Sequence, residues 1–263
     1  MDIAIVIPAR YGSRRLPGKP MAVIRGRSLL GRMWRTAKAG QGVSAVYVAT
    51  DDERVAAHAR SFGAQVIMTE PECENGTERV WQAMTRLPGK RPDAVINLQG
   101  DAVLTPPWVV QGLVDAFHAD PDTTMVTAAV PLTWATLADL VKLKQASPTS
   151  GTTVTMDKAG RALYFSKGII PYLRIKDETR PPPVHRHIGI YGYSLAVLEQ
   201  MATLPQTPLE IAEQLEQLRA LENGIPIKVV LVDYRGRTHG SVDAPEDIVE
   251  IEAIIDREGE LVP

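Results

Sequence analysis

Four cationic side chains, Arg10, Arg14, Arg15 and Lys19, stand within ten residues near the start of the chain. They follow the apolar run 3–8 directly and share the segment 10–20 with two glycines and two prolines. Backbone N–H groups and fixed positive charge at a strand-to-helix junction suit a polyphosphate. Four like charges at such spacing repel one another unless an anion gathers them. We therefore predict a phosphate-binding loop, and the alternative is a solvated basic loop.

The glycine spacing of this loop matches neither G-x-G-x-x-G nor G-x-x-x-x-G-K-[ST]. A dinucleotide-binding fold and an ordinary NTPase loop are therefore not indicated. Two aspartates are candidates for holding a metal ion beside the phosphates. Asp101 ends a buried-type strand, where a carboxylate is a natural ligand for Mg²⁺, although it could also be a turn or N-cap residue. Asp243, in "SVDAPED", is either a second metal ligand or the N-cap of the last helix.

A third group of polar residues lies in the last third of the chain. Glu213, Glu216 and Gln217 stand at i, i+3 and i+4 in a predicted helix over 210–224, hence on one helix face. That helix face is either a binding surface or a row of ordinary solvent-exposed charged side chains. His187 alternates with apolar residues in "HRHIGIYGY" and is either a site residue or a structural histidine.

The elements that position these residues alternate between strand and helix in the first half of the chain. This alternation predicts a doubly wound, mainly parallel α/β sheet, in which ligands bind beyond the C-terminal ends of the strands. The loops at 10–20, 69–79 and 99–101 share that edge. The predicted strands cover 3–8, 44–50, 64–69 and 93–101, and the predicted helices cover 29–40, 51–63, 78–87 and 106–120.

The alternation breaks after about residue 125. Short strand patterns follow one another, so we expect a smaller mixed β lobe over about 126–200, inserted into a single domain of 1–263. The helix over 210–224, a strand over 227–232 and a helix over 243–259 complete the chain. The strand patterns of the lobe cover 125–132, 152–156, 162–166 and 187–194.

Composition limits the function classes. The 263 residues carry 29 Lys and Arg against 31 Asp and Glu, a net charge of −2, which does not indicate a nucleic-acid partner. No apolar run approaches the ~20 residues that span a bilayer. The N-terminal residues lack a signal-peptide pattern. Cys73 is the single cysteine, so an intrachain disulfide and a cysteine-based zinc site are excluded, and a cytoplasmic location is expected.

Eight motifs together resemble those of the 3-deoxy-D-manno-octulosonate (Kdo) cytidylyltransferases, also called CMP-Kdo synthetases. They occur in the order of that family and cover nearly the whole chain. The resemblance implies a Rossmann-like nucleotidyltransferase fold that transfers CMP from CTP to an acidic acceptor with Mg²⁺, in a homodimer. The motifs are "IPARYGSRRLPGKP", "VATDDERV", "NGTERV", "NLQGD", "ALYFSKGIIPY", "HRHIGIYGY", "TPLEIAEQLEQLR" and "VDAPEDI".

The resemblance also implies roles for individual residues. Arg10, Arg15, Lys19 and Asp101 are expected to act in catalysis, with Asp101 and Asp243 as metal ligands. Acceptor contacts are expected from Lys167, His187, Tyr191, Glu213, Glu216 and Gln217. Nucleotide contacts are expected from Ala9, Arg10, Gly12, Ser13, Lys19, Thr50, Asn75, Gly76, Thr77 and Gln99.

Three departures from the family pattern lie on or beside the acceptor side. "QGDAV" stands for the usual Q-G-D-E-P, "TTVTM" for a lysine-bearing strand, and Ser166–Lys167 for Ser-Arg. An ammonium cannot grip a carboxylate with the two parallel bonds of a guanidinium. The acceptor is therefore Kdo or a related 3-deoxy-2-keto sugar acid, and the alternative is a small phosphonate such as phosphonoformate.

Two other classes are further alternatives. A nucleotide-sugar glycosyltransferase usually carries a D-x-D metal motif, whereas here Val103 stands two residues after Asp101. A non-catalytic CTP-binding module would not need two metal carboxylates beside a cationic loop. Release of pyrophosphate from CTP in the presence of an acid separates these alternatives from a cytidylyltransferase.

Overall fold

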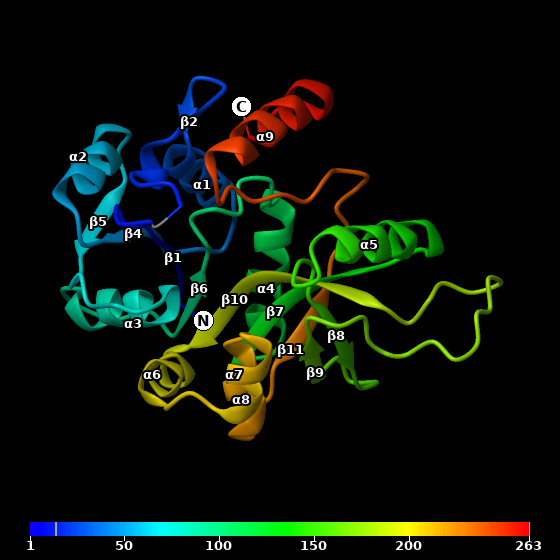
Figure 1. The fold of residues 1–263 in the computed structure, drawn as a ribbon. Coiled ribbons are helices and arrows are strands. Elements are labelled where there is room, and N and C mark those ends of the chain that lie inside the picture. Colours follow the sequence, from blue (N-terminus) through cyan, green and yellow to red (C-terminus); the bar gives the residue numbers. More distant parts are fainter. Residues whose placement is uncertain (14, 263) are drawn as a thin grey trace.

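A mixed sheet runs through the centre of the protein in the computed structural model, which describes residues 1–13 and 15–262 (Figure 1). Its seven central strands lie side by side in an order that differs from the chain order, as crossover connections require. Along the sheet they are β11 (Lys228–Leu231), β7 (Met125–Pro131), β10 (His185–Ser194), β6 (Ala94–Asn97), β1 (Ile3–Pro8), β4 (Ala45–Thr50) and β5 (Gln65–Met68).

Most neighbouring strands run parallel, as predicted. β1 pairs in parallel with both β4 and β6, β4 pairs in parallel with β5, and β7 pairs in parallel with β11. β10 runs antiparallel to β6 and β7. The C-terminal ends of β1, β4 and β6 therefore meet at one edge of the sheet, where the loops that follow them lie together.

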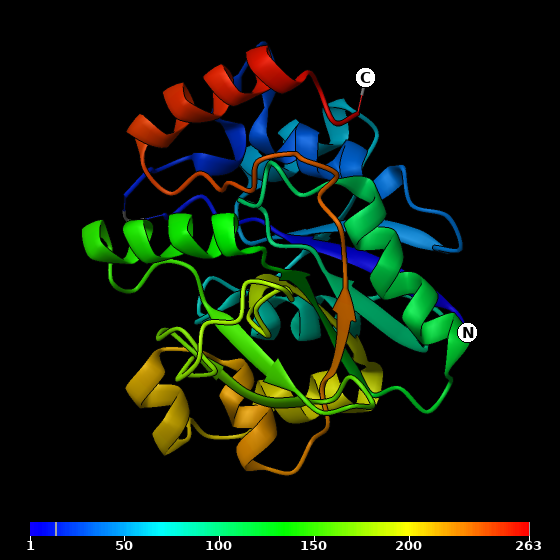
Figure 2. The ribbon, with the colours of Figure 1, turned by 90° about the vertical axis from the view of Figure 1, so that its right-hand side faces the viewer.

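Helices cover both faces of this sheet (Figures 1 and 2). Ile3, Ile5 and Ile7 of β1 are fully buried in one apolar cluster, while Val6 between them belongs to a second cluster on the other face. This alternation follows from the two-residue period of a strand. None of the described helices is long and apolar enough to cross a bilayer. The first cluster contains side chains of α1 (Leu29–Lys38), α2 (Glu53–Ser61), α4 (Pro107–Ala119) and α9 (Pro245–Glu258), and the second contains those of α3 (Gly76–Arg86), α6 (Leu195–Thr203) and α8 (Gln217–Glu222).

Polar side chains begin several of these helices. Ser28 Oγ accepts a hydrogen bond from the Gly31 N–H, Asp52 from the Arg54 N–H, and Asn75 from the Glu78 N–H. Each satisfies a backbone donor that the first helical turn leaves unpaired. Between β1 and α1 the chain forms a 3₁₀ turn, η1 (Lys19–Met21), and a small hairpin of β2 (Val23–Ile24) and β3 (Arg27–Ser28).

The segment expected to form an inserted lobe shares the central sheet through β7 and β10. The hairpin of β8 (Thr153–Met156) and β9 (Ala162–Ser166) pairs with β10 alongside that path. The segment also contains a helix that we did not predict, α5 (Trp134–Ala146). Of its residues only Leu137 and Leu140 are buried, so the apolar period that would indicate a helix is weak. The lobe's role in acceptor binding and dimerisation stays a prediction.

The single helix predicted over 210–224 is wrong. The structure has two short helices, α7 (Pro208–Glu213) and α8, separated by Gln214 in the left-handed conformation at φ 53°. A buried ion pair joins them: Arg219 Nε lies 2.8 Å from Glu210 Oε2. In a straight helix Glu210 and Arg219 would lie apart, and each buried charge would lack its partner. An unpaired buried charge costs far more free energy than one residue in the left-handed conformation.

Candidate active site

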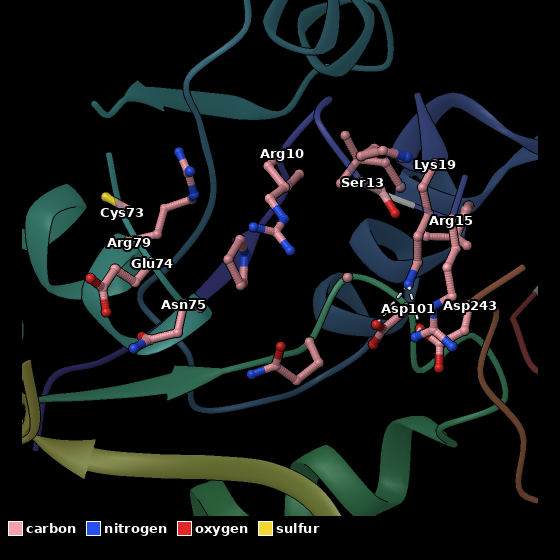
Figure 3. Close-up of a pocket in the computed structure, with 18 residues that line it drawn as sticks. Arg10, Ser13, Arg15, Lys19, Cys73, Glu74, Asn75, Arg79, Asp101 and Asp243 are labelled. Carbon is pink, nitrogen blue, oxygen red and sulfur yellow. Dashed lines mark hydrogen bonds and ion pairs between the residues drawn. The ribbon is translucent and has the colours of Figure 1, made fainter. Parts of the chain in front are cut away.

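A cavity of about 390 Å³ opens at the C-terminal edge of the parallel strands (Figure 3). It lies between the loop after β1, the N-terminus of α3 and the loop after β6. Arg10 stands between the Asn75 side and the Lys19 side of the cavity and has no hydrogen bond or ion pair with any described residue. Of the predicted nucleotide, catalytic and metal residues, the cavity is lined by Ala9, Arg10, Ser13, Arg15, Lys19, Asn75, Gly76, Gln99, Asp101 and Asp243.

Three described residues of the predicted nucleotide site are not in this lining. Gly12 is exposed outside it, and Thr50 is fully buried at the end of β4. Thr77 is also buried, and its hydroxyl donates to Glu216 at 3.1 Å. Arg14, one of the four clustered cations, lies outside the described residues.

Cations and carboxylates converge at one end of the cavity. Lys19 Nζ lies 2.8 Å from Asp101 Oδ2 and 3.2 Å from Asp243 Oδ1, and Arg15 Nη2 lies 3.0 Å from Asp243 Oδ1 (Figure 3). The Lys19 side chain is 13% exposed, so water screens its ion pairs only in part. The loop after β1, the end of β6 and the start of α9 meet at this point.

The backbone explains why Asp243 reaches this end of the cavity. Its neighbour Val242 donates an N–H to the Asp101 carbonyl at 3.1 Å, which joins the two aspartate loops. Asp247 accepts hydrogen bonds from the N–H groups of Asp243 and Ala244 at 2.6 and 2.8 Å and so closes the start of α9. The carboxylate of Asp243 is thereby left for Lys19 and Arg15 instead of capping the helix.

The two carboxylates fit a divalent cation. Asp101 Oδ2 and Asp243 Oδ1 already converge on a single positive centre, the Lys19 ammonium, and both border the open cavity. Two protein carboxylates with further oxygens from phosphate and water match the donor set that Mg²⁺ takes. No cluster of three His, Cys, Asp or Glu side chains that could hold a metal occurs among the described residues.

Two glycines let the walls of the cavity approach each other. A Cβ on Gly100 would lie 2.8 Å from the Pro8 carbonyl oxygen, a contact that real Cβ atoms do not make. A Cβ on Gly76 would lie 3.3 Å from the Gln99 amide and 3.4 Å from the Pro8 ring. The ends of β1 and β6 and the start of α3 are thus packed closely enough for backbone and amide groups to contact one small ligand.

Three residues at the α3 end of the cavity were not predicted as site residues: Cys73, Glu74 and Arg79. Arg79 is 2% exposed and donates to Thr69 Oγ1 at 2.6 Å and to Asp51 Oδ2 at 3.2 Å. A buried guanidinium fixed in this way can present its remaining surface to a ligand. Arg79 could have been predicted as a site residue from the sequence, since it belongs to the motif "NGTERV". Burial raises the pKa of the Cys73 thiol, which does not favour a nucleophilic thiolate.

A second cavity of about 240 Å³ brings together three of the predicted acceptor residues, His187, Tyr191 and Gln217. Lys167 and Glu213 are not in its lining. Glu213 instead accepts hydrogen bonds from Ser166 Oγ and the Lys167 N–H, both at 2.7 Å. Because the helix breaks at Gln214, the expectation that Glu213, Glu216 and Gln217 share one helix face is wrong.

Glu216 lines neither cavity, although its chain neighbours Leu215 and Gln217 line the second one. One of its carboxylate oxygens accepts the Thr77 hydroxyl, while Oε1 is buried with no hydrogen-bond partner in the described residues. Burial raises the pKa of this carboxyl group. A buried oxygen without a partner is costly, so this position is adapted to a ligand or a water molecule.

His187 is held as a neutral imidazole. Its Nε2 lies 2.9 Å from Thr127 Oγ1, and its ring packs between those of Phe165 and Tyr191. Burial, with a smaller effect of the charge on Lys167, lowers the pKa of His187 to about 3. Burial also raises the pKa of Tyr191 well above its ordinary value. Both side chains therefore act as neutral hydrogen-bonding groups near pH 7.

The two cavities are connected through the register of β6 and β10. Tyr191 of the second cavity is paired with Asn97. Asn97 Oδ1 in turn accepts a hydrogen bond from Gln99, a residue of the first cavity, at 3.3 Å. A cation-rich cavity with two convergent carboxylates thus stands beside a neutral, hydrogen-bonding cavity. This arrangement suits transfer of a phosphate-bearing group to a second, smaller substrate.

The fold and this pair of cavities define a nucleotidyltransferase, and comparison with known proteins gives its class. The sequence profile of the family described as Cytidylyltransferase matches residues 4–229. The chain is 52% identical to the 3-deoxy-manno-octulosonate cytidylyltransferase of Maricaulis maris over the full length of both proteins. It therefore belongs to the Kdo cytidylyltransferase family, and it is a cytidylyltransferase.

More distant relatives carry names of the same reaction class. The chain is 39% identical to the mitochondrial 3-deoxy-manno-octulosonate cytidylyltransferase of Arabidopsis thaliana, over 95% of this chain and 82% of that protein. It is also 39% identical to the 8-amino-3,8-dideoxy-manno-octulosonate cytidylyltransferase of Shewanella woodyi, over 96% and 98%. A solved structure described as CMP:2-keto-3-deoxy-manno-octonic acid synthetase complexed with CTP has a TM-score of 0.85 at 35% identity, covering 98% of this chain and 100% of that one.

Proposed function

We propose that this protein transfers CMP from CTP to Kdo or a closely related 3-deoxy-2-keto sugar acid, with Mg²⁺, and releases pyrophosphate. The observation that carries the proposal is the convergence of Lys19, Arg15, Asp101 and Asp243 at one end of a cavity large enough for a nucleotide. Full-length identity of 52% to a protein named for the Kdo reaction supports the choice of acceptor.

The chain's own residues neutralise and position the triphosphate. A CTP tail entering the cavity meets Arg10, which has no other partner among the described residues, and Arg15 and Lys19, which exchange carboxylate contacts for phosphate contacts. An acceptor hydroxyl oxygen attacks the α-phosphorus and gives its proton to solvent. A new P–O bond forms, the bond from the α-phosphorus to the oxygen that bridges it to the β-phosphate breaks, and pyrophosphate leaves. Positioning and charge stabilisation supply most of the acceleration in such transfers.

Asp101 and Asp243 would hold the magnesium ion. When bound, the ion neutralises phosphate charge and lowers the pKa of a coordinated hydroxyl. The protein's part is to keep two carboxylates converged while the phosphates arrive, and the hydrogen bond from Val242 to the Asp101 carbonyl contributes to this.

In this proposal the acceptor binds in the second cavity, beside Tyr191 and Gln217. Two of the three curated relatives above are named for Kdo and one for its 8-amino form, and none is named for a phosphonate. The phosphonate alternative thus has no support. The preference for Kdo over the amino sugar rests on the difference between 52% and 39% identity.

We also propose that two copies associate through the segment between β9 and β10. This segment projects from the body of the protein (Figure 1) and carries Tyr172 at 89% and Ile175 at 80% exposure. Large apolar side chains on a projecting segment are typical of an interface. Light scattering after chromatography tests this: Y172S/I175S is expected to halve the mass of a wild-type dimer. A cytoplasmic location is consistent with the free thiol of Cys73.

An acceptor panel tests the reaction. Wild-type protein is mixed with CTP and either Kdo, 8-amino-Kdo or phosphonoformate, with Mg²⁺ or with EDTA, and pyrophosphate is measured. We expect release with Kdo and Mg²⁺, less with the amino sugar, and none with phosphonoformate or EDTA. Binding of CTP by calorimetry without pyrophosphate from any sugar acid would contradict the proposal and favour a binding module.

A further inference from the structure

The motif "VATDDERV" covers the end of β4 and the start of α2, yet none of its residues lines the first cavity. Its polar groups bind one another instead. Thr50 Oγ1 accepts the Asp52 N–H at 3.3 Å, and the Asp52 side chain caps α2. Any effect of this motif on the cavity therefore passes through the residues that it contacts.

Asp52 fixes the guanidinium of Arg54. Asp52 Oδ1 accepts a hydrogen bond from Arg54 Nε at 3.0 Å, and Oδ2 accepts one from Nη2 at 2.6 Å. These are the two parallel bonds of an arginine–carboxylate fork. Oδ1 also accepts the backbone N–H of Arg54 at 2.9 Å, so the helix cap and the fork form one unit. A side chain that is 62% exposed is thus kept in one orientation.

The fixed guanidinium lies over the ring of Tyr11, in the loop after β1. Arg54 Cζ is 3.5 Å from the centroid of that ring. A flat guanidinium stacked on an aromatic face gains cation–π attraction and contact area together. α2 also packs against η1, which follows the same loop. The helix therefore contacts the loop at its beginning and at its end.

Tyr11 closes the loop on itself. Its carbonyl oxygen accepts the N–H groups of Ser13 and Gly18, both at 2.9 Å. A Cβ on Gly18 would lie 3.2 Å from Tyr11 Cε2, and Gly18 has a φ of 71°. Glycine is therefore required at position 18 by the backbone conformation and by the approach of the ring. Residues 11 and 18 are held side by side through both the carbonyl and the ring of Tyr11.

The two closing residues are the chain neighbours of two cations of the first cavity. Arg10 precedes Tyr11, Lys19 follows Gly18, and both cations line the cavity (Figure 3). A fixed distance between residues 11 and 18 therefore fixes the distance between the points from which these two side chains start. A triphosphate, which contacts several cations at once, depends on this spacing more than a monophosphate does.

We propose that Arg54 and Tyr11 are positioning residues that set the spacing of Arg10 and Lys19 for a triphosphate. The inference rests on the proposed function, because it takes the CTP tail as the ligand of these cations. Cations that are held in place before the ligand arrives bind it at a lower entropic cost. Loss of the stack should therefore weaken the binding of CTP more than that of CMP, whereas a general loss of stability would weaken both alike.

Calorimetry of CTP and CMP binding, with Mg²⁺ and without acceptor, tests the proposal in Arg54→Ala, Tyr11→Leu and the double variant. Arg54→Ala is expected to weaken CTP about 2- to 5-fold, as for the loss of one exposed cation–π contact, with CMP nearly unchanged. Tyr11→Leu also opens the loop, so we expect a loss of roughly 10-fold for CTP. In the double variant Arg54→Ala should add nothing to Tyr11→Leu, because its effect passes through the ring.

Tyr11→Phe keeps the ring and is expected to keep the ratio of CTP to CMP affinity. Arg60→Ala, an exposed arginine on the same helix that pairs with Glu53, is the matched control. If Tyr11→Leu does not fold, Arg54→Ala and Arg54→Lys carry the test, and the lysine, which lacks the flat group, should restore the ratio only in part.

Three outcomes would overturn this assignment alone: an unchanged ratio in Arg54→Ala, an equal loss in Arg60→Ala, or additive losses in the double variant. Wild-type protein that binds CTP but releases no pyrophosphate with any sugar acid would overturn the proposed function and leave this assignment standing.

Discussion

Lys19 Nζ lies 2.8 Å from Asp101 Oδ2, and the same ammonium lies 3.2 Å from Asp243 Oδ1. One cation from the loop after β1 therefore joins a carboxylate after β6 to a carboxylate before α9, across 82 and 224 residues of chain. Without a positive centre between them, two carboxylates at this distance would repel each other. Lys19 thus keeps the predicted metal ligands together in the free protein.

Asp101→Ala should remove most of the activity. The change deletes one of the two carboxylates and leaves Lys19 paired with Asp243 alone, so both the proposed metal and the phosphate contacts are disturbed. We expect kcat/KM for CTP to fall roughly 1,000-fold at any Mg²⁺ concentration, measured as pyrophosphate release. Asp139→Ala, an exposed aspartate on α5, should behave as wild type. Near-normal turnover of Asp101→Ala would remove Asp101 from the metal site.

Lys19→Met should make the stability of the protein depend more strongly on Mg²⁺. The variant removes the ammonium but keeps an apolar stem of similar length, so Asp101 loses its cationic partner and Asp243 keeps only Arg15. We expect a lower melting temperature than wild type without metal and a larger rise on adding Mg²⁺, followed by calorimetry in the absence of nucleotide. Lys142→Met, on the exposed side of α5, is the control. Equal Mg²⁺ responses in Lys19→Met and wild type would mean that the carboxylates do not bind the ion.

Much of the fold was predictable from local patterns, because the buried strands β1, β4 and β6 are continuous apolar runs and α2 and α3 begin with capping residues. The fold of the second half of the chain was harder to predict. β7 and β10 are separated by more than fifty residues, yet they pair in the central sheet, and no local pattern shows which distant strands will be neighbours. α5 buries too few side chains to show a helical period.

The candidate site was predictable where its residues lie in short loops after strands. Arg10, Lys19 and Asp101 line one cavity as the order of the strands requires. The predicted acceptor residues come together only in part: His187, Tyr191 and Gln217 line the second cavity, whereas Lys167, Glu213 and Glu216 do not. The backbone break at Gln214, which separates Glu213 from Gln217, has no signal in the sequence pattern.

Glu210→Ala should be strongly destabilising. Glu210 and Arg219 are both 6% exposed as side chains, and the pair connects α7 to α8 across the left-handed residue Gln214. Removing the carboxylate leaves a buried guanidinium without its partner, which costs about 3–5 kcal/mol. Urea unfolding measures the loss. Glu222→Ala, whose partner is an exposed backbone N–H of Leu209, should cost under about 1 kcal/mol.

The double variant Glu210→Leu/Arg219→Met tests whether the loss of stability comes from the unpaired charge or from the loss of other contacts at these two positions. It removes both charges and keeps apolar volume, so much of the stability is expected to return. A double variant as unstable as Glu210→Ala would show that the helix break depends on the hydrogen bonds of Arg219 to the Met201 and Leu204 carbonyls instead.

His187→Gln should change how stability depends on pH. The pKa of His187 is about 3 in the native protein against 6.5 ordinarily, so between these values the unfolded chain takes up a proton that the native protein does not. Proton uptake by the unfolded state means that stability falls as pH falls, by up to about 1.4 kcal/mol per pH unit for this residue. The variant lacks that contribution. The difference in unfolding free energy between wild type and His187→Gln should therefore narrow from about pH 6 to about pH 4, measured by urea unfolding at each pH.

His118→Gln, on the exposed face of α4, is the control. A gap that stays constant across this range would show that His187 is not held neutral by the packing of β10 against Phe165.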